Sequence, residues 1–347
     1  MAVSYILSNQ ELLSWVGMLS DEFNIVGPIK KKRGQVIFEK IEDIKQDIAL
    51  DYCSTMLSPR NVIYPSIQKL FHIDYKNNQC QTIMPDNGKD SIILGVHSCD
   101  MHAVTVLDRI FLGGICDIYY DELRQRTVNI VLNCNKTCGK GFCLSMGTGP
   151  FLQINEGYDL ILTKLREDYL VEVGSERGKN LIENAQGIQK SKEEDLIEKD
   201  RTEKEALRSF KKIINTDGLA ELLLKNLEHP VYQNTAEARC LGCTNCTMVC
   251  PTCYCYTIID DVSFDLQTIE RKRYWDSCQE LNFAGVHDGN FRATRKARLR
   301  QFVTHKLGTW VDQYGCFGCI GCGRCMTWCP TGIDLTEIAK EIQSKPL

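Results

Sequence analysis

The sequence predicts an α+β protein of several domains, with an N-terminal α/β domain, a helical linker and a cysteine-rich C-terminal domain. Three observations support this prediction. The 347 residues exceed the length of one ordinary domain. Short apolar runs alternate with amphipathic segments over the first half of the chain, and closely spaced cysteines gather near its C-terminal end. The expected domains span residues 1–175, 176–232 and 233–347.

The N-terminal domain is predicted from alternating helix and strand signals. The capping box "SNQE" at 8–11 opens an amphipathic helix that extends to about Leu19. The runs at 91–96, 128–133 and 158–163 are short and apolar, as buried strands are. The segment between the first two runs suits a helix. These signals together predict a small α/β unit.

The linker is predicted from its charges. Residues 176–232 include "SKEEDLIEKDRTEKEALRSFKKII", in which both signs of charge are mixed. Mixed charges suit a solvated helix better than a disordered tail. We therefore expect a helical linker between two domains, and a further helical stretch at about 256–314 as an insertion in the C-terminal domain.

Composition narrows the function classes. The formal net charge is −4 and the basic stretches are short, so no nucleic-acid partner is expected. No run approaches the roughly 20 apolar residues of a membrane helix, and the N-terminus lacks the pattern of a signal peptide. The 19 cysteines, many of them closely spaced, favour metal binding over a disulfide framework. The sequence thus predicts a cytoplasmic protein without a membrane segment.

Two cysteine runs share the spacing C-x2-C-x2-C-x3-C-P. The first is "CLGCTNCTMVCP" and the second is "CIGCGRCMTWCP". A second run that began at Cys316 would require a cysteine at the position of Met326, so Cys316 stands outside the motif. The eight cysteines of the motif are Cys240, Cys243, Cys246, Cys250, Cys319, Cys322, Cys325 and Cys329.

This spacing is typical of proteins with two [4Fe–4S] clusters. Three thiolates two residues apart reach the iron corners of one cluster, and the fourth ligates the neighbouring cluster. The first cluster is therefore expected on Cys240, Cys243, Cys246 and Cys329, and the second on Cys319, Cys322, Cys325 and Cys250. The alternative is a pair of zinc ribbons, but these usually present two C-x2-4-C knuckles rather than three successive steps. The C-terminal domain is thus predicted to be a dicluster, ferredoxin-like domain.

The expected insertion carries a basic helix. Two interpretations remain open: its side chains compensate the negative clusters or receive an acidic partner, or they form a solvated helix face. The basic residues concerned are Arg292, Arg295, Lys296, Arg298 and Arg300.

Four further cysteines predict a third [4Fe–4S] cluster in the N-terminal domain. Cys99 follows the strand run at 91–96, and Cys134 follows the run at 128–133, with Cys138 and Cys143 close behind. If these strands are parallel neighbours, their C-terminal ends meet at one edge of the sheet, where ligands bind. The alternative is that Cys99 is a small buried apolar residue and that the other three form a zinc knuckle or no site.

The remaining cysteines have weaker signals. Cys53, Cys80 and Cys116 are isolated and are expected to be structural. Four others, which are Cys253, Cys255, Cys278 and Cys316, are enough for another cluster. Because C-x-C spacing separates adjacent side chains unless the backbone bends, packing or shielding of the cluster sulfurs is the preferred interpretation. No dinucleotide or P-loop motif is present, so the electron source and sink are expected on other chains.

At the level of motifs, the chain resembles the 4Fe–4S electron-transfer subunit of anaerobic sulfite reductase and the β subunit of cytoplasmic sulfhydrogenases. The matching segments are "SCDMHAVTVLDRIFL", "GFCLSMGTGP", "CLGCTNCTMVCPTCYCYTI", "YWDSC" and "CIGCGRCMTWCPTGI", within residues 90–347. One departure concerns the third cluster: Gly141 occupies the place of the family's penultimate cysteine, and Cys138 stands five positions before Cys143.

The resemblance to the sulfite reductase subunit implies an iron–sulfur subunit without catalytic residues of its own. It would relay electrons from a flavin subunit that oxidises NADH or NADPH to a sirohaem subunit that reduces sulfite to sulfide. The β subunit of a nickel–iron sulfhydrogenase is the alternative within the family. An iron–sulfur redox sensor is the alternative from another class, but the chain shows no effector module. A direct reduction of disulfide or sulfur at Cys253, Cys255 and Cys278 is a third possibility.

Overall fold

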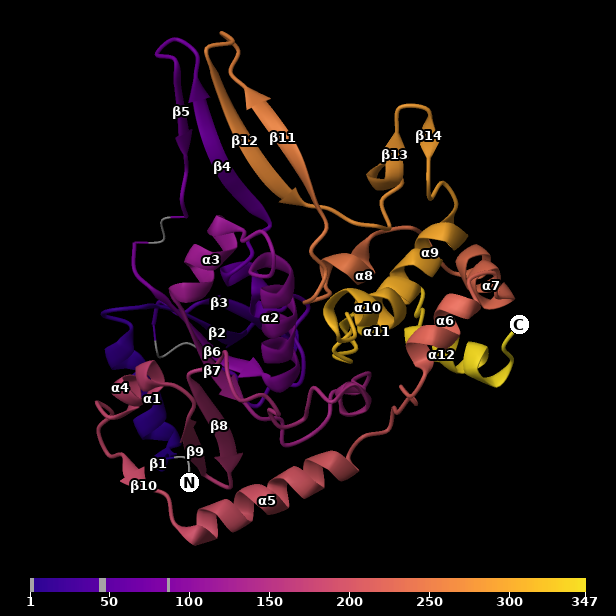
Figure 1. Ribbon diagram of the computed structural model, residues 1–347. Coiled ribbons are helices and arrows are strands. Elements are labelled where there is room, and N and C mark those ends of the chain that lie inside the picture. The colour runs from indigo at the N-terminus through magenta and orange to yellow at the C-terminus, as the bar shows by residue number, and fades with distance from the viewer. Residues whose placement is uncertain (1–2, 44–47, 86–87) are drawn as a thin grey trace.

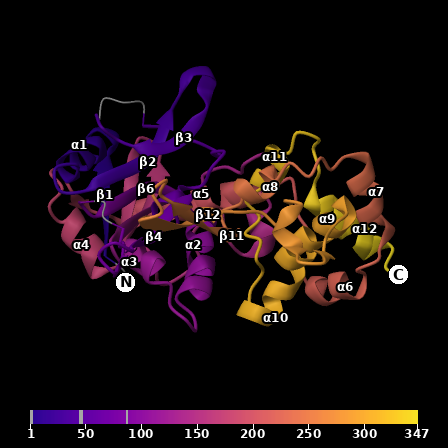
Figure 2. The same ribbon diagram turned by 90° about the horizontal axis from the view of Figure 1, so that it is seen from above.

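The computed structural model describes residues 3–43, 48–85 and 88–347. An N-terminal unit and a C-terminal unit lie side by side (Figures 1 and 2), and one long helix lies in the connection between them (Figure 1). The α+β fold class is therefore confirmed. No helix among the described residues is long and apolar enough to cross a membrane.

The N-terminal unit is built on an eight-stranded sheet. Its order is β10-β1-β9-β8-β7-β6-β2-β3, and the strands β2, β6, β7 and β8 run parallel to one another. Every residue of β6 and β7 is buried, as expected for strands covered on both faces. The strands are β1 (Ser4–Ser8), β2 (Asn24–Lys30), β3 (Val36–Lys40), β6 (Ser91–His97), β7 (Thr127–Leu132), β8 (Leu160–Leu165), β9 (Asp168–Val173) and β10 (Gln189–Lys190).

The helices of this unit pack against the sheet. The capping box at Ser8 forms as the sequence predicts, because Ser8 accepts from the Glu11 N–H at 3.2 Å and the Glu11 carboxylate accepts from the Ser8 N–H at 2.8 Å. The α-helices are α1 (Asn9–Leu19), α2 (Ser98–Phe111), α3 (Ile118–Gln125) and α4 (Glu176–Ile182), and the 3₁₀ turns are Lys32–Gly34, Pro59–Val62 and Cys143–Met146.

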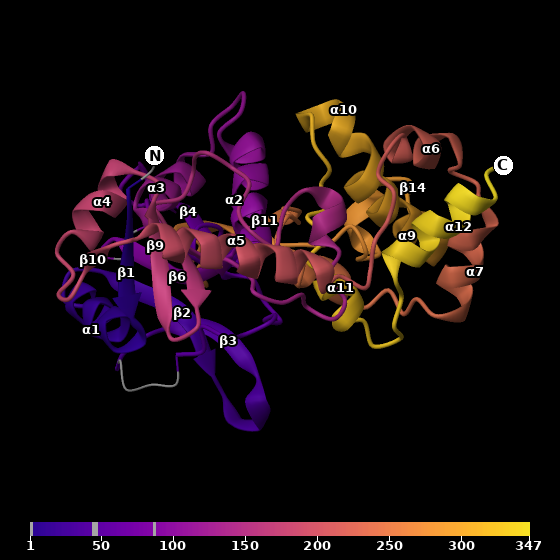
Figure 3. The ribbon, with the colours of Figure 1, turned by 90° about the horizontal axis from the view of Figure 1, so that it is seen from below.

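The N-terminal unit extends further along the chain than the expected boundary at 175. Helix α4 places Ile182 in the core of the sheet, and β10 pairs with β1. A strand of two residues is too short to show a periodic pattern in the sequence. It forms because the edge strand β1 offers unpaired backbone N–H and C=O groups. The connection between the units is α5 (Glu193–Arg208), which packs on β8 (Figure 3).

A second, four-stranded sheet joins the two units at one end. Its order is β11-β12-β4-β5, so a hairpin from the expected insertion pairs with a hairpin from the N-terminal unit (Figure 1). The sequence predicts a helical insertion, and this half of it is instead β-structure. Pairing partners that lie about 200 residues apart in the chain leave no local sequence signal. The strands are β4 (Ile67–Asp74), β5 (Gln79–Thr82), β11 (Tyr256–Val262) and β12 (Thr268–Trp275).

The C-terminal unit packs short helices around the cysteine runs. The second half of the insertion is helical, as expected, and includes a single π-helical turn, η5 (His305–Thr309). The α-helices are α6 (Leu219–Lys225), α7 (Pro230–Ala238), α8 (Asn245–Met248), α9 (Arg295–Thr304), α10 (Trp310–Tyr314), α11 (Arg324–Thr327) and α12 (Leu335–Ser344). A 3₁₀ turn, Asn282–Ala284, precedes the small hairpin of β13 (Gly285–Val286) and β14 (Gly289–Asn290).

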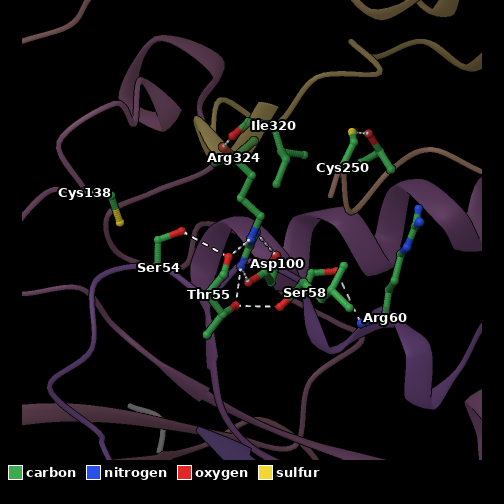
Figure 4. Close-up of polar contacts among 12 residues, drawn as sticks. Ser54, Thr55, Ser58, Arg60, Asp100, Cys138, Cys250, Ile320 and Arg324 are labelled. Carbon is green, nitrogen blue, oxygen red and sulfur yellow. Dashed lines mark hydrogen bonds and ion pairs between the residues drawn. The ribbon is translucent and has the colours of Figure 1, made fainter. Parts of the chain in front are cut away.

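A buried ion pair connects the two units. The Arg324 guanidinium at the start of α11 donates to both carboxylate oxygens of Asp100 on α2, at 2.6 and 2.7 Å (Figure 4). It also donates to the Thr55 carbonyl at 2.9 Å. Arg324 and Asp100 are each 2% exposed. Because buried charges require partners, this pair fixes how the second cysteine run sits against the N-terminal unit.

The two units also approach each other through backbone. The Phe142 N–H donates to the Gly321 carbonyl at 2.7 Å, and Thr148 donates to the Ile320 carbonyl at 2.6 Å. Gly321 has a φ of +66°, and a Cβ built there would lie 2.7 Å from backbone atoms of Cys143. Glycine is therefore required at this position by both conformation and space.

We expect Gly321→Ala to lower stability by about 1–3 kcal/mol more than Gly315→Ala, because only the first substitution overpacks the contact between the units. Gly315 has a φ of +68° with no atom within 4 Å, so it is a control for backbone strain alone. The measurement is urea unfolding of the anaerobically reconstituted protein. Equal losses for the two variants would contradict the close contact at Gly321.

Candidate metal centres

The two cysteine runs adopt the same local backbone. Gly242 and Gly321 both have a φ of +66°, and Thr244 and Gly323, two residues later, have φ of +65° and +75°. Each run then continues into one short helix, α8 or α11, and these two helices contact each other. Repeated left-handed residues wind the chain tightly, so successive thiols face a common centre. The repeat in sequence is thus also a repeat in conformation.

A first cavity of about 570 Å³ lies between the runs. The sulfurs expected to bind one cluster line it together, although they come from both ends of the C-terminal unit. Its cysteines are Cys240, Cys243, Cys246, Cys325 and Cys329. The structure therefore brings Cys329 to the first run, as the exchange of fourth ligands requires. We call this group, without Cys325, site A.

A second set of thiols is grouped by its electrostatics. Burial and the neighbouring thiols of Cys319 and Cys322 raise the pKa of Cys325, and Cys250 adds to the same shift. Burial and thiols of the same group raise the pKa of Cys319 to about 12. Thiols with a raised pKa stay protonated in water at neutral pH, and they release their protons when they bind a metal. We call Cys250, Cys319, Cys322 and Cys325 site B.

Backbone N–H groups point at ligand sulfurs in both sites. The Gly321 N–H donates to Cys319 Sγ at 3.4 Å, and the Ile333 N–H donates to Cys329 Sγ at 3.3 Å. Bonds of this kind stabilise the thiolate form and raise the potential of a cluster bound to it.

A second cavity, of about 350 Å³, lies at the edge of the large sheet. It is lined by all four cysteines expected to form the third site, which are Cys99, Cys134, Cys138 and Cys143. Strands β6 and β7 are parallel neighbours, so Cys99 at the start of α2 and Cys134 after β7 meet at their C-terminal ends. We call these four cysteines site C.

The displaced cysteine of site C has an additional neighbour. The Cys138 thiol donates to the Cys53 carbonyl, and its pKa is raised by burial and by the Cys53 thiol to about 12. The isolated position of Cys53 in the sequence predicts a structural role, and nothing in its local pattern indicates that it lies against this site. Site C also adjoins site B, because Cys322 lines the same cavity.

Most basic side chains of this helix form hydrogen bonds or ion pairs with other residues of the protein. Arg295 donates to the Cys240 carbonyl at 2.6 Å, and Arg298 is buried and donates to the carbonyls of Arg292 and Ala293. Lys296 pairs with Glu228 at 2.8 Å. The interpretation as a solvated face is therefore wrong for the buried Arg298, whereas Arg295 is exposed and Lys296 pairs with Glu228 at the surface.

The remaining cysteines divide into two groups. Cys80 and Cys116 are exposed, and burial raises the pKa of Cys316 although Arg109 opposes the shift. Cys253, Cys255 and Cys278 line a cavity of their own with His305 and Lys306. Sequence reasoning missed both His305 and Lys306, which carry no motif.

Over residues 3–43, 48–85 and 88–347, no three or more His, Cys, Asp or Glu side chains are arranged to hold a single metal ion. The thiols surround cavities instead. A [4Fe–4S] cube holds its ligands apart, one at each iron corner. The donor set of sites A and B, all thiols, fits this group.

Comparisons with known proteins agree with this geometry. Residues 239–333 match the family of 4Fe-4S dicluster domains. The chain is 33% identical over 329 residues to the sulfhydrogenase 2 subunit beta of Pyrococcus furiosus, and the match covers 94% of each chain. The predicted pair of [4Fe–4S] clusters is thereby confirmed. The chain belongs to the sulfhydrogenase β-subunit family, as an iron–sulfur electron-transfer protein with a C-terminal dicluster domain.

Proposed function

We propose that this chain relays electrons from a flavin subunit that oxidises NADH or NADPH to a sirohaem subunit that reduces sulfite to sulfide. The observation that carries the relay is the contact between sites. Cys322 of site B lines the cavity of site C, and Cys325 of site B lines the cavity of site A. Three metal centres in such a row form a path through the protein.

The ligands proposed for sites A and C are thiols that line the two cavities, and those proposed for site B are the thiols grouped by their mutual electrostatic effects. Site A takes Cys240, Cys243, Cys246 and Cys329; site B takes Cys250, Cys319, Cys322 and Cys325; site C takes Cys99, Cys134, Cys138 and Cys143. A [4Fe–4S] cluster supplies one-electron transfer when bound. The protein supplies rigidity, because the ligands of site B belong to two separate runs and its loop contacts the loop of site C.

Sulfite reduction to sulfide takes six electrons, so the relay is used repeatedly in each turnover. The chain offers no side chain that must act as an acid or base in this role. The motifs that the chain shares with the sulfite reductase subunit support this assignment. The chemical step is therefore placed on the sirohaem partner, in an anaerobic, cytoplasmic complex.

The similarity to a sulfhydrogenase subunit favours a second candidate, the β subunit of a nickel–iron hydrogenase complex. The relay within the chain would be the same, and only the partner at its end would differ.

We expect a complex purified anaerobically from the native source to contain flavin and sirohaem and to reduce sulfite with NADH or NADPH. The measurements are optical spectra, metal analysis and sulfide release. Nickel with hydrogen evolution, in the absence of sirohaem, would establish the second candidate instead.

Replacement of Cys325 by serine is expected to remove the cluster of site B, with loss of about four iron atoms per chain and of electron transfer. Cys316→Ser is the matched control, because Cys316 lies in the same loop but outside every proposed site. The measurements are iron content, EPR of the reduced protein and transfer from a dye donor. An equal loss in both variants would show that the ligands are assigned in the wrong register.

Replacement of Cys99 by serine is expected to remove about four iron atoms and leave the EPR signals of sites A and B unchanged. Cys80→Ser, in the exposed strand β5, is the control. Unchanged iron content in the Cys99 variant would contradict a cluster at site C.

A further inference from the structure

A further cavity of about 250 Å³ lies next to site B, and the function proposed above does not use it. Three thiols and one imidazole line it, namely Cys253, Cys255, Cys278 and His305. Their positions come from different elements. The two cysteines of the C-x-C stretch precede β11, Cys278 follows β12, and His305 begins the π-helical turn after α9.

The C-x-C spacing does not separate its cysteines here. Cys253 and Cys255 line the same cavity, while the ring of Tyr254 packs at 5.7 Å from Trp310 and 6.2 Å from Phe111. The Asp276 N–H donates to the Cys255 carbonyl at 2.8 Å and holds the chain beside Cys278. Cys278 lines the same cavity as Cys255. Three sulfurs thus lie on one side of the stretch.

His305 supplies the fourth donor. Sequence spacing groups Cys316 with these three cysteines, but His305 lines the cavity instead. Its imidazole lines the cavity together with the three thiols. A neutral imidazole is a common metal ligand through its ring nitrogen. The residue opens a single π-helical turn, a distortion that is frequent at functional sites.

Lys306 is a buried cation beside this cavity and beside site B. It is 3% exposed, and its ammonium donates to Thr252 at 2.8 Å. Among the ion pairs of the described residues, none involves Lys306 or provides it with a carboxylate. Burial opposes its charge, but the thiols of Cys250 and Cys253 raise its pKa. A buried ammonium requires a counter-charge, which thiolate ligands provide.

A second buried cation positions the same stretch. The Arg60 guanidinium donates to the carbonyls of Cys253 and Met248 and stacks on Trp275 at 3.8 Å. This contact ties the new cavity to the N-terminal unit.

We propose that Cys253, Cys255, Cys278 and His305 bind a fourth iron–sulfur cluster, which we call site D. Zinc also accepts three cysteines and one histidine, but zinc has no redox activity. The Cys253 N–H donates to the carbonyl of Cys250, a proposed ligand of site B, at 3.4 Å. Site D is therefore in direct contact with the relay. A cluster held there would supply one-electron transfer beside site B.

This inference rests on the relay proposed above, but its test does not. Wild-type protein, reconstituted anaerobically with iron and sulfide, is expected to hold about sixteen iron atoms per chain. The variants Cys278→Ser and Cys255→Ser are expected to hold about twelve, with the reduced signals of sites A and B retained. Cys316→Ser is the control and keeps the wild-type content.

The variant His305→Cys tests the same site by a change in the EPR signal, so its result cannot be explained by a failure of the protein to fold. It is expected to retain iron and to change only the EPR signal and potential of the additional cluster. Wild-type iron content in both serine variants would overturn the proposal. So would one zinc per chain that is lost on mutation of Cys278, or a Cys255–Cys278 disulfide in place of a cluster. Failure of electron transfer to partners, with iron contents as expected, would contradict the relay and leave site D in place.

Discussion

The arrangement of the metal sites depends on the ion pair between Arg324 and Asp100. Arg324 lies between two ligands of site B in the sequence, and Asp100 directly follows Cys99 of site C. The pair is buried, so removal of one partner would leave an uncompensated charge at a cost of about 3–5 kcal/mol. The glycines of the same loop allow the backbones of the two units to touch. A shift of one unit against the other would therefore separate sites B and C.

Site B lies next to each of the other sites. Its thiols adjoin site A through Cys325, site C through Cys322 and the proposed site D through Cys250. Its ligands come from both cysteine runs, so the C-terminal unit cannot open without breaking it. The buried Lys306 places a positive charge beside site B. Such a charge favours the reduced state of a nearby cluster and suits the central position that site B has in the proposed relay.

Local patterns predict the parts of this protein that are encoded locally. The capping box at Ser8, the buried strands β6 and β7 and the repeated cysteine spacing are all readable in the sequence. Long-range pairing is not. The β11–β12 hairpin joins β4 across about 200 residues, β10 is too short for a periodic signal, and His305 meets the C-x-C stretch only through folding. Sequence spacing alone therefore suggests Cys316 where the fold presents a histidine.

The exchange of fourth ligands between the two runs can be tested by iron anomalous scattering from anaerobic crystals. We expect iron density in the first cavity with Cys329 Sγ bonded to the cluster of Cys240, Cys243 and Cys246, and with Cys250 Sγ bonded to the neighbouring cluster. Density in which each run keeps its own fourth cysteine, or a zinc signal at these positions, would show that the exchange does not occur.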